Sequence, residues 1–162
     1  MTEARAGSET HWFRSYDLDE ARACPPSRDP HPHQVTSLSK LDQWLSRAQP
    51  PAGAILALPT GAGKTFTAVR FICRRPISEG FKVLWLAHTH HLLEQAFIEF
   101  ENGVPLVAEP KNSLNIRVVS GTIGHFPVHT IRPSDDVVIG TIQAIRRAYD
   151  VRHPQLEGFL KA

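Results

Sequence analysis

The stretch LPTGAGKT, residues 58–65, combines glycines, a lysine and a threonine at a spacing that suits phosphate binding. Gly61 and Gly63 permit backbone conformations that a Cβ obstructs, so successive N–H groups can converge on phosphate oxygens. Lys64 supplies a cation for the β and γ phosphates, and the Thr65 hydroxyl is placed to ligate Mg²⁺. The full pattern GxxxxGK[ST] has glycine where this chain has leucine, and the alternative interpretation is a glycine-rich turn without a ligand.

A phosphate-binding turn needs a strand before it and a helix behind it, because the helix N-terminus favours an anion. The apolar run 54–58 predicts a short strand, and the segment from Lys64 to Arg75 predicts a helix that Pro76 ends. Apolar residues also recur at helical spacing between Gln34 and the break PPAG, which predicts an amphipathic helix before the strand.

The rest of the chain repeats this alternation of apolar strands and helices. KVLWLA at 82–87 predicts a buried strand, an apolar stripe over 92–100 predicts a helix, and IRVVSG and DVVIGT predict two more strands. The fold class predicted is therefore α/β, with a parallel sheet flanked by helices. Residues 1–30 are expected to be an irregular lead-in, and residues 31–162 are expected to form one domain.

Composition excludes some classes of protein. The 18 basic and 16 acidic side chains give a net charge of +2, so bulk charge gives no argument for nucleic-acid binding. Cys24 and Cys73 lie far apart without CxxC spacing, which favours a reducing compartment over a disulfide framework. Neither a signal peptide nor a run of ~18 apolar residues is present, so we expect a cytoplasmic protein without a membrane partner.

The loop resembles motif I of the superfamily-two helicases and translocases, the DEAD/DEAH-box-like proteins, in which PTG-x-GKT is the usual core. This resemblance implies a P-loop NTPase (RecA-like) fold and a site for ATP and Mg²⁺, with Thr65 meeting the metal through the nucleotide. The residues it assigns to the nucleotide are Thr60, Gly61, Ala62, Gly63, Lys64 and Thr65. In that family a glutamine upstream of the loop reads the adenine edge, which assigns this role to Gln34 in HPHQ. The alternative for Gln34 is a helix-entry residue without a ligand.

Two further stretches resemble motifs of the same family, in the same order. Residues 83–96, VLWLAHTHHLLEQA, resemble motif Ia in the branch close to the UvrB and type III restriction-enzyme motor subunits, which implies that His88 and Thr89 contact a nucleic-acid backbone. Thr89 stands where arginine is frequent, so the salt-dependent part of the affinity should be small. Residues 137–145 resemble the later motif with a TIQ-like turn, which implies the same contact for Thr141. Nucleic acid is the implied partner, with DNA favoured over RNA.

The histidines at 88, 90 and 91 have an alternative interpretation as a metal cluster, since imidazole is the commonest metal ligand. Two adjacent histidines that open a helix point apart, and neither a carboxylate nor a cysteine stands at ligand spacing. A solvated helix start is the interpretation that this spacing favours.

Hydrolysis in such motors needs a carboxylate pair at the end of another apolar strand to hold Mg²⁺ and orient water. Glu109 lies between two prolines without a second carboxylate, and Asp135 and Asp136 precede their strand. The resemblance, which covers about residues 31–148, therefore implies the N-terminal part of a first RecA-like lobe, truncated before the DExH motif. It implies no catalytic residue and no ATP turnover by this chain alone.

In the family, the DExH and SAT strands lie between the loop strand and the strands with the nucleic-acid motifs, so we expect an incomplete sheet. One alternative function is a non-hydrolysing nucleotide-binding or interaction module, completed by a separate polypeptide that supplies the missing motor elements. Another is a small P-loop phosphotransferase served by Arg74 and Arg75, although no acidic residue is placed to activate an acceptor.

Overall fold

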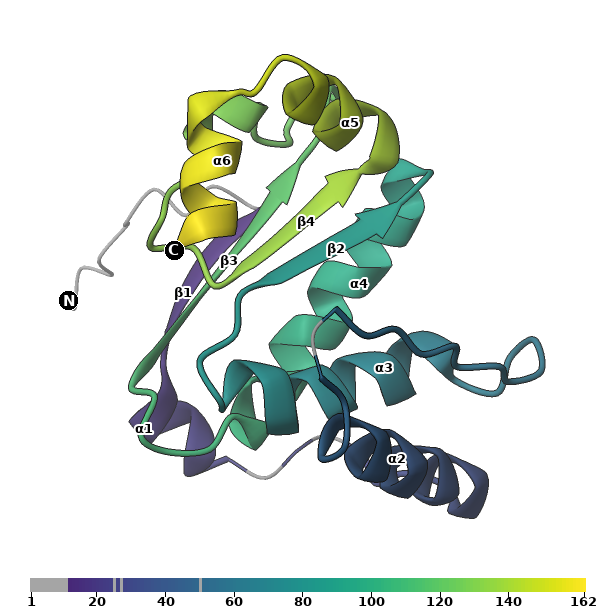
Figure 1. The fold of residues 1–162 in the computed structure, drawn as a ribbon. Coiled ribbons are helices and arrows are strands. Elements are labelled where there is room, and N and C mark those ends of the chain that lie inside the picture. The colour runs from purple at the N-terminus through teal and green to yellow at the C-terminus, as the bar shows by residue number, and fades with distance from the viewer. Residues whose placement is uncertain (1–11, 25, 27, 50) are drawn as a thin grey trace, which may run out of the picture. The chain divides into compact units, whose positions relative to one another are not determined.

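A computed structural model describes residues 12–24, 26, 28–49 and 51–162 (Figure 1). Its internal contacts divide the chain into two compact units. The first contains Met1–Tyr16, of which residues 12–16 are described, together with Lys82–Phe97 and Ser113–Ala162. The second contains Asp17–Phe81 and Ile98–Asn112. Within the described residues, none of the helices has the length and apolarity needed to cross a membrane.

The first unit contains a sheet of four strands in the order β1-β3-β4-β2. The strands are β1 (Phe13–Asp17), β2 (Val83–Ala87), β3 (Ser113–Val119) and β4 (Val137–Thr141). β4 pairs in parallel with both β2 and β3, and all five of its residues are buried. The run VVIGT explains this position, because a strand that is covered on both faces reads as continuous apolar sequence.

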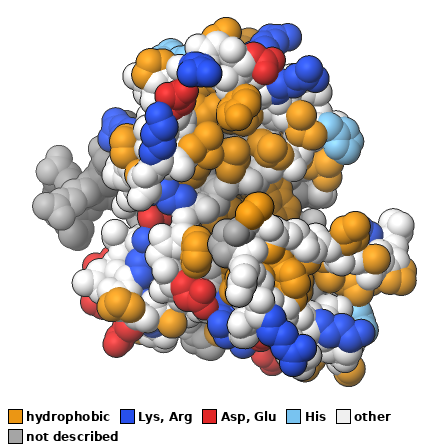
Figure 2. Space-filling model, viewed as in Figure 1, with side chains coloured by type: hydrophobic (Ala, Val, Ile, Leu, Met, Phe, Trp, Pro, Cys, Tyr) orange, Lys and Arg blue, Asp and Glu red, His pale blue; other side chains and the backbone are white. Residues whose placement is uncertain are grey.

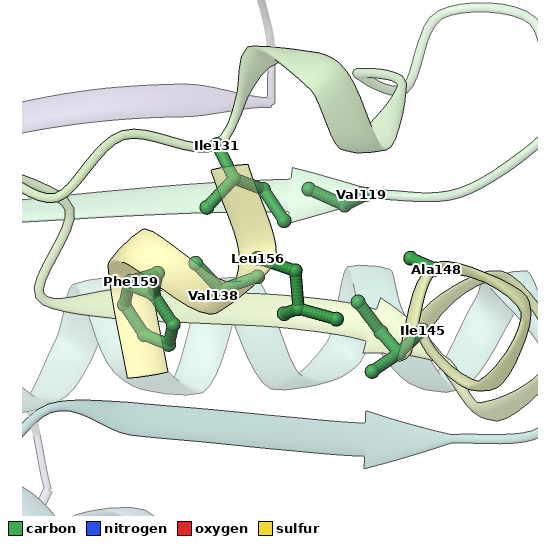
Figure 3. Close-up of a cluster of buried hydrophobic side chains, with 7 residues drawn as sticks. All are labelled: Val119, Ile131, Val138, Ile145, Ala148, Leu156 and Phe159. Atoms are coloured by element: carbon green, nitrogen blue, oxygen red, sulfur yellow. The ribbon is translucent and has the colours of Figure 1, made fainter. Parts of the chain in front are cut away.

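Helices cover both faces of this sheet (Figure 1). One face carries α5 (Ile142–Asp150) and α6 (Pro154–Lys161), and the other carries the first half of α4 (His90–Gly103). The α5 and α6 side encloses a cluster of buried apolar side chains (Figure 3), which are Val119, Ile131, Val138, Ile145, Ala148, Leu156 and Phe159. The short helix η3 (Val128–Thr130) leads into Ile131.

Gly140 explains how closely α5 can approach β4. A Cβ at this residue would lie 2.7 Å from Cγ1 of Ile145, which is closer than carbon atoms can pack. The glycine in VVIGT therefore makes room for the first turn of α5. The predicted α/β sheet flanked by helices is confirmed, and so are strands at 82–87 and in DVVIGT. The full burial predicted for 82–87 is wrong, because β2 is last in the strand order and only its Ala87 is buried, while Leu86 is 45% exposed.

The second unit is helical. It contains α1 (Leu18–Arg22), α2 (Pro32–Leu45), α3 (Lys64–Ile72), the π-helix η1 (Cys73–Ile77), the end of α4 and η2 (Val104–Leu106). Its buried side chains include Val69, Phe71, Cys73, Phe100 and Val107. Cys73 is a core residue, and its burial raises the pKa of the thiol to about 12.

The strand predicted at 54–58 is not formed. These residues have no regular secondary structure, and the side chain of Ile55 is 94% exposed. A strand needs a neighbour for its N–H and C=O groups, and none of the four strands in the described chain pairs with this segment. An apolar run alone therefore gave the wrong prediction here.

Pro76 does not end the helix that begins at Lys64, contrary to the prediction. The chain passes from α3 into η1, which contains Pro76 and continues to Ile77. A proline inside an α-helix lacks an N–H and collides with the preceding turn, whereas the wider π turn accommodates the ring. At the end of this π turn, the Ser78 hydroxyl donates a hydrogen bond to the Cys73 carbonyl oxygen at 2.9 Å.

The lead-in predicted as irregular over residues 1–30 contains β1 and α1 in its described part. Asp17 ends the strand and caps the helix, since its Oδ1 accepts a hydrogen bond from Asp19 N at 2.9 Å. Leu18 is fully buried, so this segment adds to the core. Each element has only five residues, too few for periodicity to show in the sequence. The division into a lead-in and a domain from residue 31 stays a prediction.

A buried ion pair joins β3 to the loop before β4. Arg117 Nε lies 2.7 Å from Oδ2 of Asp135, and its Nη2 lies 3.1 Å from Oδ1. The guanidinium also lies over the rings of Phe13 at 4.5 Å and Phe126 at 5.1 Å. Asp135 therefore has a structural role as the counter-charge of Arg117. It lies just before the N-terminal end of β4.

Replacement of Asp135 by asparagine should leave a buried guanidinium without its counter-charge. We expect Asp135→Asn to lower the free energy of unfolding in urea by about 3–5 kcal/mol. The matched control is Glu157→Gln, because Glu157 pairs with Lys161 on the exposed surface of α6. That change should cost less than about 1 kcal/mol. Equal losses in the two variants would contradict the structural role of Asp135.

Candidate functional site

The glycine-rich loop has the backbone geometry of an anion-binding turn. Gly61 and Gly63 have φ angles of +79° and +78°, which L side chains rarely adopt. Gly63 is the N-cap of α3, and its carbonyl accepts the hydrogen bond from Thr67 N at 2.9 Å. The N–H groups ahead of that bond are the ones that a helix leaves without an intrahelical acceptor. They form a positive helix end that suits phosphate oxygens.

The Lys64 ammonium lies on the loop itself. Its Nζ donates hydrogen bonds to the carbonyl oxygens of Leu58 and Pro59, each at 3.1 Å, and the side chain is exposed. The exposed cation can exchange these neutral acceptors for an anion, because a hydrogen bond to a charged acceptor is stronger. Thr65 follows in the first turn of α3 and is partly buried, whereas Thr60 is exposed. This donor set of backbone amides, an ammonium and a hydroxyl fits a polyphosphate with Mg²⁺.

Gln34 lies beside this loop. Its Nε2 donates to the carbonyl oxygen of Ala62 at 3.0 Å, and its Oε1 accepts from the backbone N–H of His31 at 2.9 Å. The side chain is 6% exposed, and the second bond closes the first turn of α2. The structure thus brings Gln34 to the loop that the sequence indicated, and uses its amide on the loop backbone. The role of Gln34 in reading adenine stays a prediction.

His33 is a loop contact that the sequence reasoning missed. Its Nε2 lies 3.1 Å from the same Ala62 carbonyl oxygen, and its ring stacks on that of His31 with centroids 5.9 Å apart. The one sequence signal was its place next to Gln34 in HPHQ. Because neighbouring residues on a helix usually face different ways, that adjacency was not enough to predict a shared acceptor.

The residues assigned to nucleic acid gather at the carboxyl edge of the sheet in the first unit. Ala87 and Thr141 are register partners in the parallel pair of β2 and β4, so His88 and Thr89 follow one strand beside the end of the other. His88 and Thr89 are exposed. Thr141 is 6% exposed, and its Oγ1 accepts from Ala144 N at 3.3 Å as the N-cap of α5. The three predicted residues therefore lie at one sheet edge, where open α/β sheets bind ligands.

A polar cluster joins the loops at this edge. His90 shares a hydrogen bond with Thr122 Oγ1 at 2.7 Å, and His125 Nδ1 lies 2.8 Å from Ser120 Oγ. Burial lowers the pKa of His125 from its ordinary value, and the Glu94 carboxylate, 3.7 Å from Nε2, opposes that shift. His90 thus binds a neighbouring loop, and we assign the cluster a role in holding the loops after β2 and β3.

The carboxylates considered for hydrolysis lie elsewhere. Asp135 and Asp136 precede β4, and Asp136 Oδ2 accepts from the backbone N–H of Asn115 at 2.8 Å. Glu109 is exposed, in the turn before Pro110. None of these three carboxylates follows the end of a strand.

Two features favour glycine at position 63: the positive φ angle and the closeness of the Gln34 side chain. Substitutions can measure the contribution of each to stability. A Cβ on Gly63 would lie 2.4 Å from Gln34 Nε2, whereas a Cβ on Gly61 would meet nothing within 4 Å. We expect Gly61→Ala to lower the free energy of unfolding by about 1–2 kcal/mol, for its backbone angle alone. Gly63→Ala should cost more.

The excess should disappear in a Gln34→Ala background, where Gly63→Ala should cost about as much as Gly61→Ala does. Urea unfolding of the four variants measures each term. An undiminished cost of Gly63→Ala without the Gln34 side chain would show that the contact is not the cause.

Comparison with known proteins now identifies the family. The family model described as type III restriction enzyme, res subunit, matches residues 28–160, a range that includes Gln34, the loop and β2 to β4. Comparisons with the curated proteins and with the solved structures gave no match. The family match agrees with the α/β sheet and supports a RecA-like P-loop domain of the superfamily-two helicase type. The chain belongs to the family of the type III restriction enzyme res subunit.

Proposed function

We propose that this chain is the ATP-binding segment of a helicase-like, nucleic-acid-dependent ATPase, in the branch close to UvrB and the type III restriction-enzyme motors. The observation that carries the proposal is the left-handed turn at Gly61 and Gly63, which opens α3 with the Lys64 ammonium lying on it. This arrangement offers amide donors and one exposed cation at a helix N-terminus.

Each residue of the loop has a proposed role towards ATP and Mg²⁺. The backbone N–H groups of the loop and of the first turn of α3 hold the phosphate oxygens, and Lys64 leaves its two carbonyl acceptors for the β and γ phosphates. The N–H of Ala62 takes part only if it leaves the Pro59 carbonyl, to which it donates at 3.1 Å. The Thr65 hydroxyl meets the Mg²⁺ that accompanies the nucleotide. Gln34 lies beside the loop. To bind the adenine edge, its amide would have to give up its hydrogen bond to His31 N or to Ala62 O.

Nucleic acid is the proposed partner at the sheet edge. His88 and Thr89 are exposed there, and the α5 N-terminus that Thr141 caps offers further donors to phosphate oxygens. DNA is favoured over RNA because the resemblance is to the UvrB and type III restriction-enzyme motors. These residues carry no fixed positive charge. The contact therefore positions the nucleic-acid backbone and contributes little salt-dependent affinity.

The carboxylates of the described chain do not suit ATP hydrolysis. Asp135 neutralises Arg117, and Glu109 stands alone before a proline, so neither can hold Mg²⁺ at a strand end. We propose that the carboxylates come from motor elements outside these residues, and that the chain carries no catalytic residue itself.

A second candidate is a non-hydrolysing nucleotide-binding module that a separate polypeptide completes. The edge of β2 favours it, since β2 pairs only with β4 in the described chain. Leu86 of β2 and Ile142 of α5 are each 45% exposed, and apolar side chains gather on this side of the first unit (Figure 2). An open strand edge with apolar side chains is a surface that another strand can cover.

Removal of the Lys64 ammonium should weaken nucleotide binding. We expect Lys64→Ala to reduce the affinity for a fluorescent ATP analogue with Mg²⁺ at least about tenfold, because a charge-assisted hydrogen bond is lost. Fluorescence titration measures this affinity. The control is Lys40→Ala, an exposed lysine of α2 in the same unit, which should leave it unchanged.

The same preparations test turnover. Phosphate release should stay at background with and without nucleic acid, in the wild type and in both variants. Sustained turnover that Lys64→Ala abolishes would contradict the absence of catalytic groups, and unchanged binding in Lys64→Ala would contradict the loop as the nucleotide site.

An arginine at position 89 should strengthen the proposed nucleic-acid contact. We expect Thr89→Arg to raise the affinity for a labelled single-stranded DNA and to steepen the slope of log affinity against log salt by about 0.7. Fluorescence anisotropy over a series of salt concentrations gives the slope. Ser134→Arg adds the same charge before β4, at the other end of that strand, and should change the slope less. Equal effects would mean that the sheet edge is not the binding surface.

A further inference from the structure

One carbonyl oxygen of the loop accepts two side-chain donors from α2. Gln34 Nε2 lies 3.0 Å from Ala62 O, and His33 Nε2 lies 3.1 Å from the same atom. A carbonyl oxygen can only accept, so the His33 ring carries its proton on Nε2 when it makes this bond. Both lone pairs of one oxygen are then used by neighbouring residues of a single helical turn.

The direction of this carbonyl fixes the direction of the next amide. In a trans peptide unit the C=O of Ala62 and the N–H of Gly63 point opposite ways. Holding the oxygen towards α2 therefore aims the Gly63 N–H away from α2. A rotated peptide unit would present an oxygen in place of that N–H, and an oxygen repels phosphate.

This peptide unit needs a restraint more than most. Gly63 has no Cβ, and its φ of +78° is only one of several conformations open to a glycine. Ala62 lies between two glycines, both with positive φ. Backbone hydrogen bonds hold the flanking peptide units, through Ala62 N to Pro59 O and Thr67 N to Gly63 O, and leave the orientation of the Ala62–Gly63 unit itself to other groups. The two donors on Ala62 O select it.

We propose that His33 is a positioning residue of the phosphate-binding loop. Together with Gln34 it pins the Ala62–Gly63 peptide unit, so that the Gly63 N–H is already directed for a polyphosphate before one binds. This inference rests on the proposed function of the loop, and it adds a residue that neither the motif nor the family resemblance assigns. Preorganisation of this kind raises affinity by reducing the ordering that binding requires.

His33 and Gln34 contribute differently. Gln34 is buried and also bonds the backbone N–H of His31, so its removal disturbs the start of α2. His33 is exposed, and its ring makes a hydrogen bond to the loop carbonyl and stacks on the ring of His31. His33 can therefore be replaced without opening a cavity, and its variants report on the loop.

The test compares three variants of the whole chain by calorimetric titration with inorganic tripolyphosphate and with ATP. His33→Phe keeps a ring that can stack on His31 but has no donor, and His33→Gln restores an amide donor near the position of Nε2. We expect about three- to tenfold weaker binding of both ligands in His33→Phe, the loss that one neutral hydrogen bond predicts, and recovery in His33→Gln. His129→Phe, at an exposed histidine of η3, should bind as the wild type does.

The Gly63 amide gives a readout that a merely structural role would not move. In a ¹⁵N-labelled chain without ligand, its resonance should broaden or split in His33→Phe, while the free energy of unfolding stays near that of the wild type. Wild-type affinity in His33→Phe, or equally weak binding in the Phe and Gln variants, would overturn the inference and leave the nucleotide site standing. If the wild-type chain binds neither ligand, the proposed function itself is wrong, and this inference falls with it.

Discussion

The pairing of β4 with a parallel strand on each side is the constraint on which the first unit depends. It uses the backbone groups of β4 on both edges, and it buries all five of its residues. Parallel neighbours also bring their carboxyl ends to the same edge, which is why Thr141 and the segment after Ala87, far apart in sequence, lie at one edge. Gly140 lets α5 pack closely against β4, and Thr141, the N-cap of α5, lies at the same edge.

The loop of the second unit is held by its own polar groups. Two carbonyls hold the Lys64 ammonium, and two side chains of α2 hold the Ala62 carbonyl. In the proposed function, a phosphate competes with these neutral acceptors for the ammonium, and the two α2 side chains hold the loop backbone in place before it binds. Charge decides that competition, because a phosphate oxygen is a stronger acceptor for an ammonium than a peptide oxygen is.

Sequence patterns predicted the elements that carry a continuous or periodic apolar pattern. β2, β4, α2 and α4 all carry continuous or helical apolar patterns, and each was found close to the predicted range. The failures share another cause, since they depended on what lies beside the segment. The run 54–58 is apolar without a strand neighbour, and Pro76 is tolerated because the chain forms a π turn around it. Among the candidate site residues, the sequence motifs pointed to the loop and to Gln34. The contact of His33 with Ala62 O could not be predicted, because it depends on the direction of the side chain.

The two cysteines differ in a way that has a practical use. Cys73 is completely buried with its thiol protonated, whereas Cys24 is exposed in the segment between α1 and α2. Thiolate is the form that reacts with maleimides, so the native chain offers one accessible attachment point for a dye without any substitution. A fluorophore on Cys24 would therefore sit in the connection that leads to α2, the helix whose first turn contacts the loop.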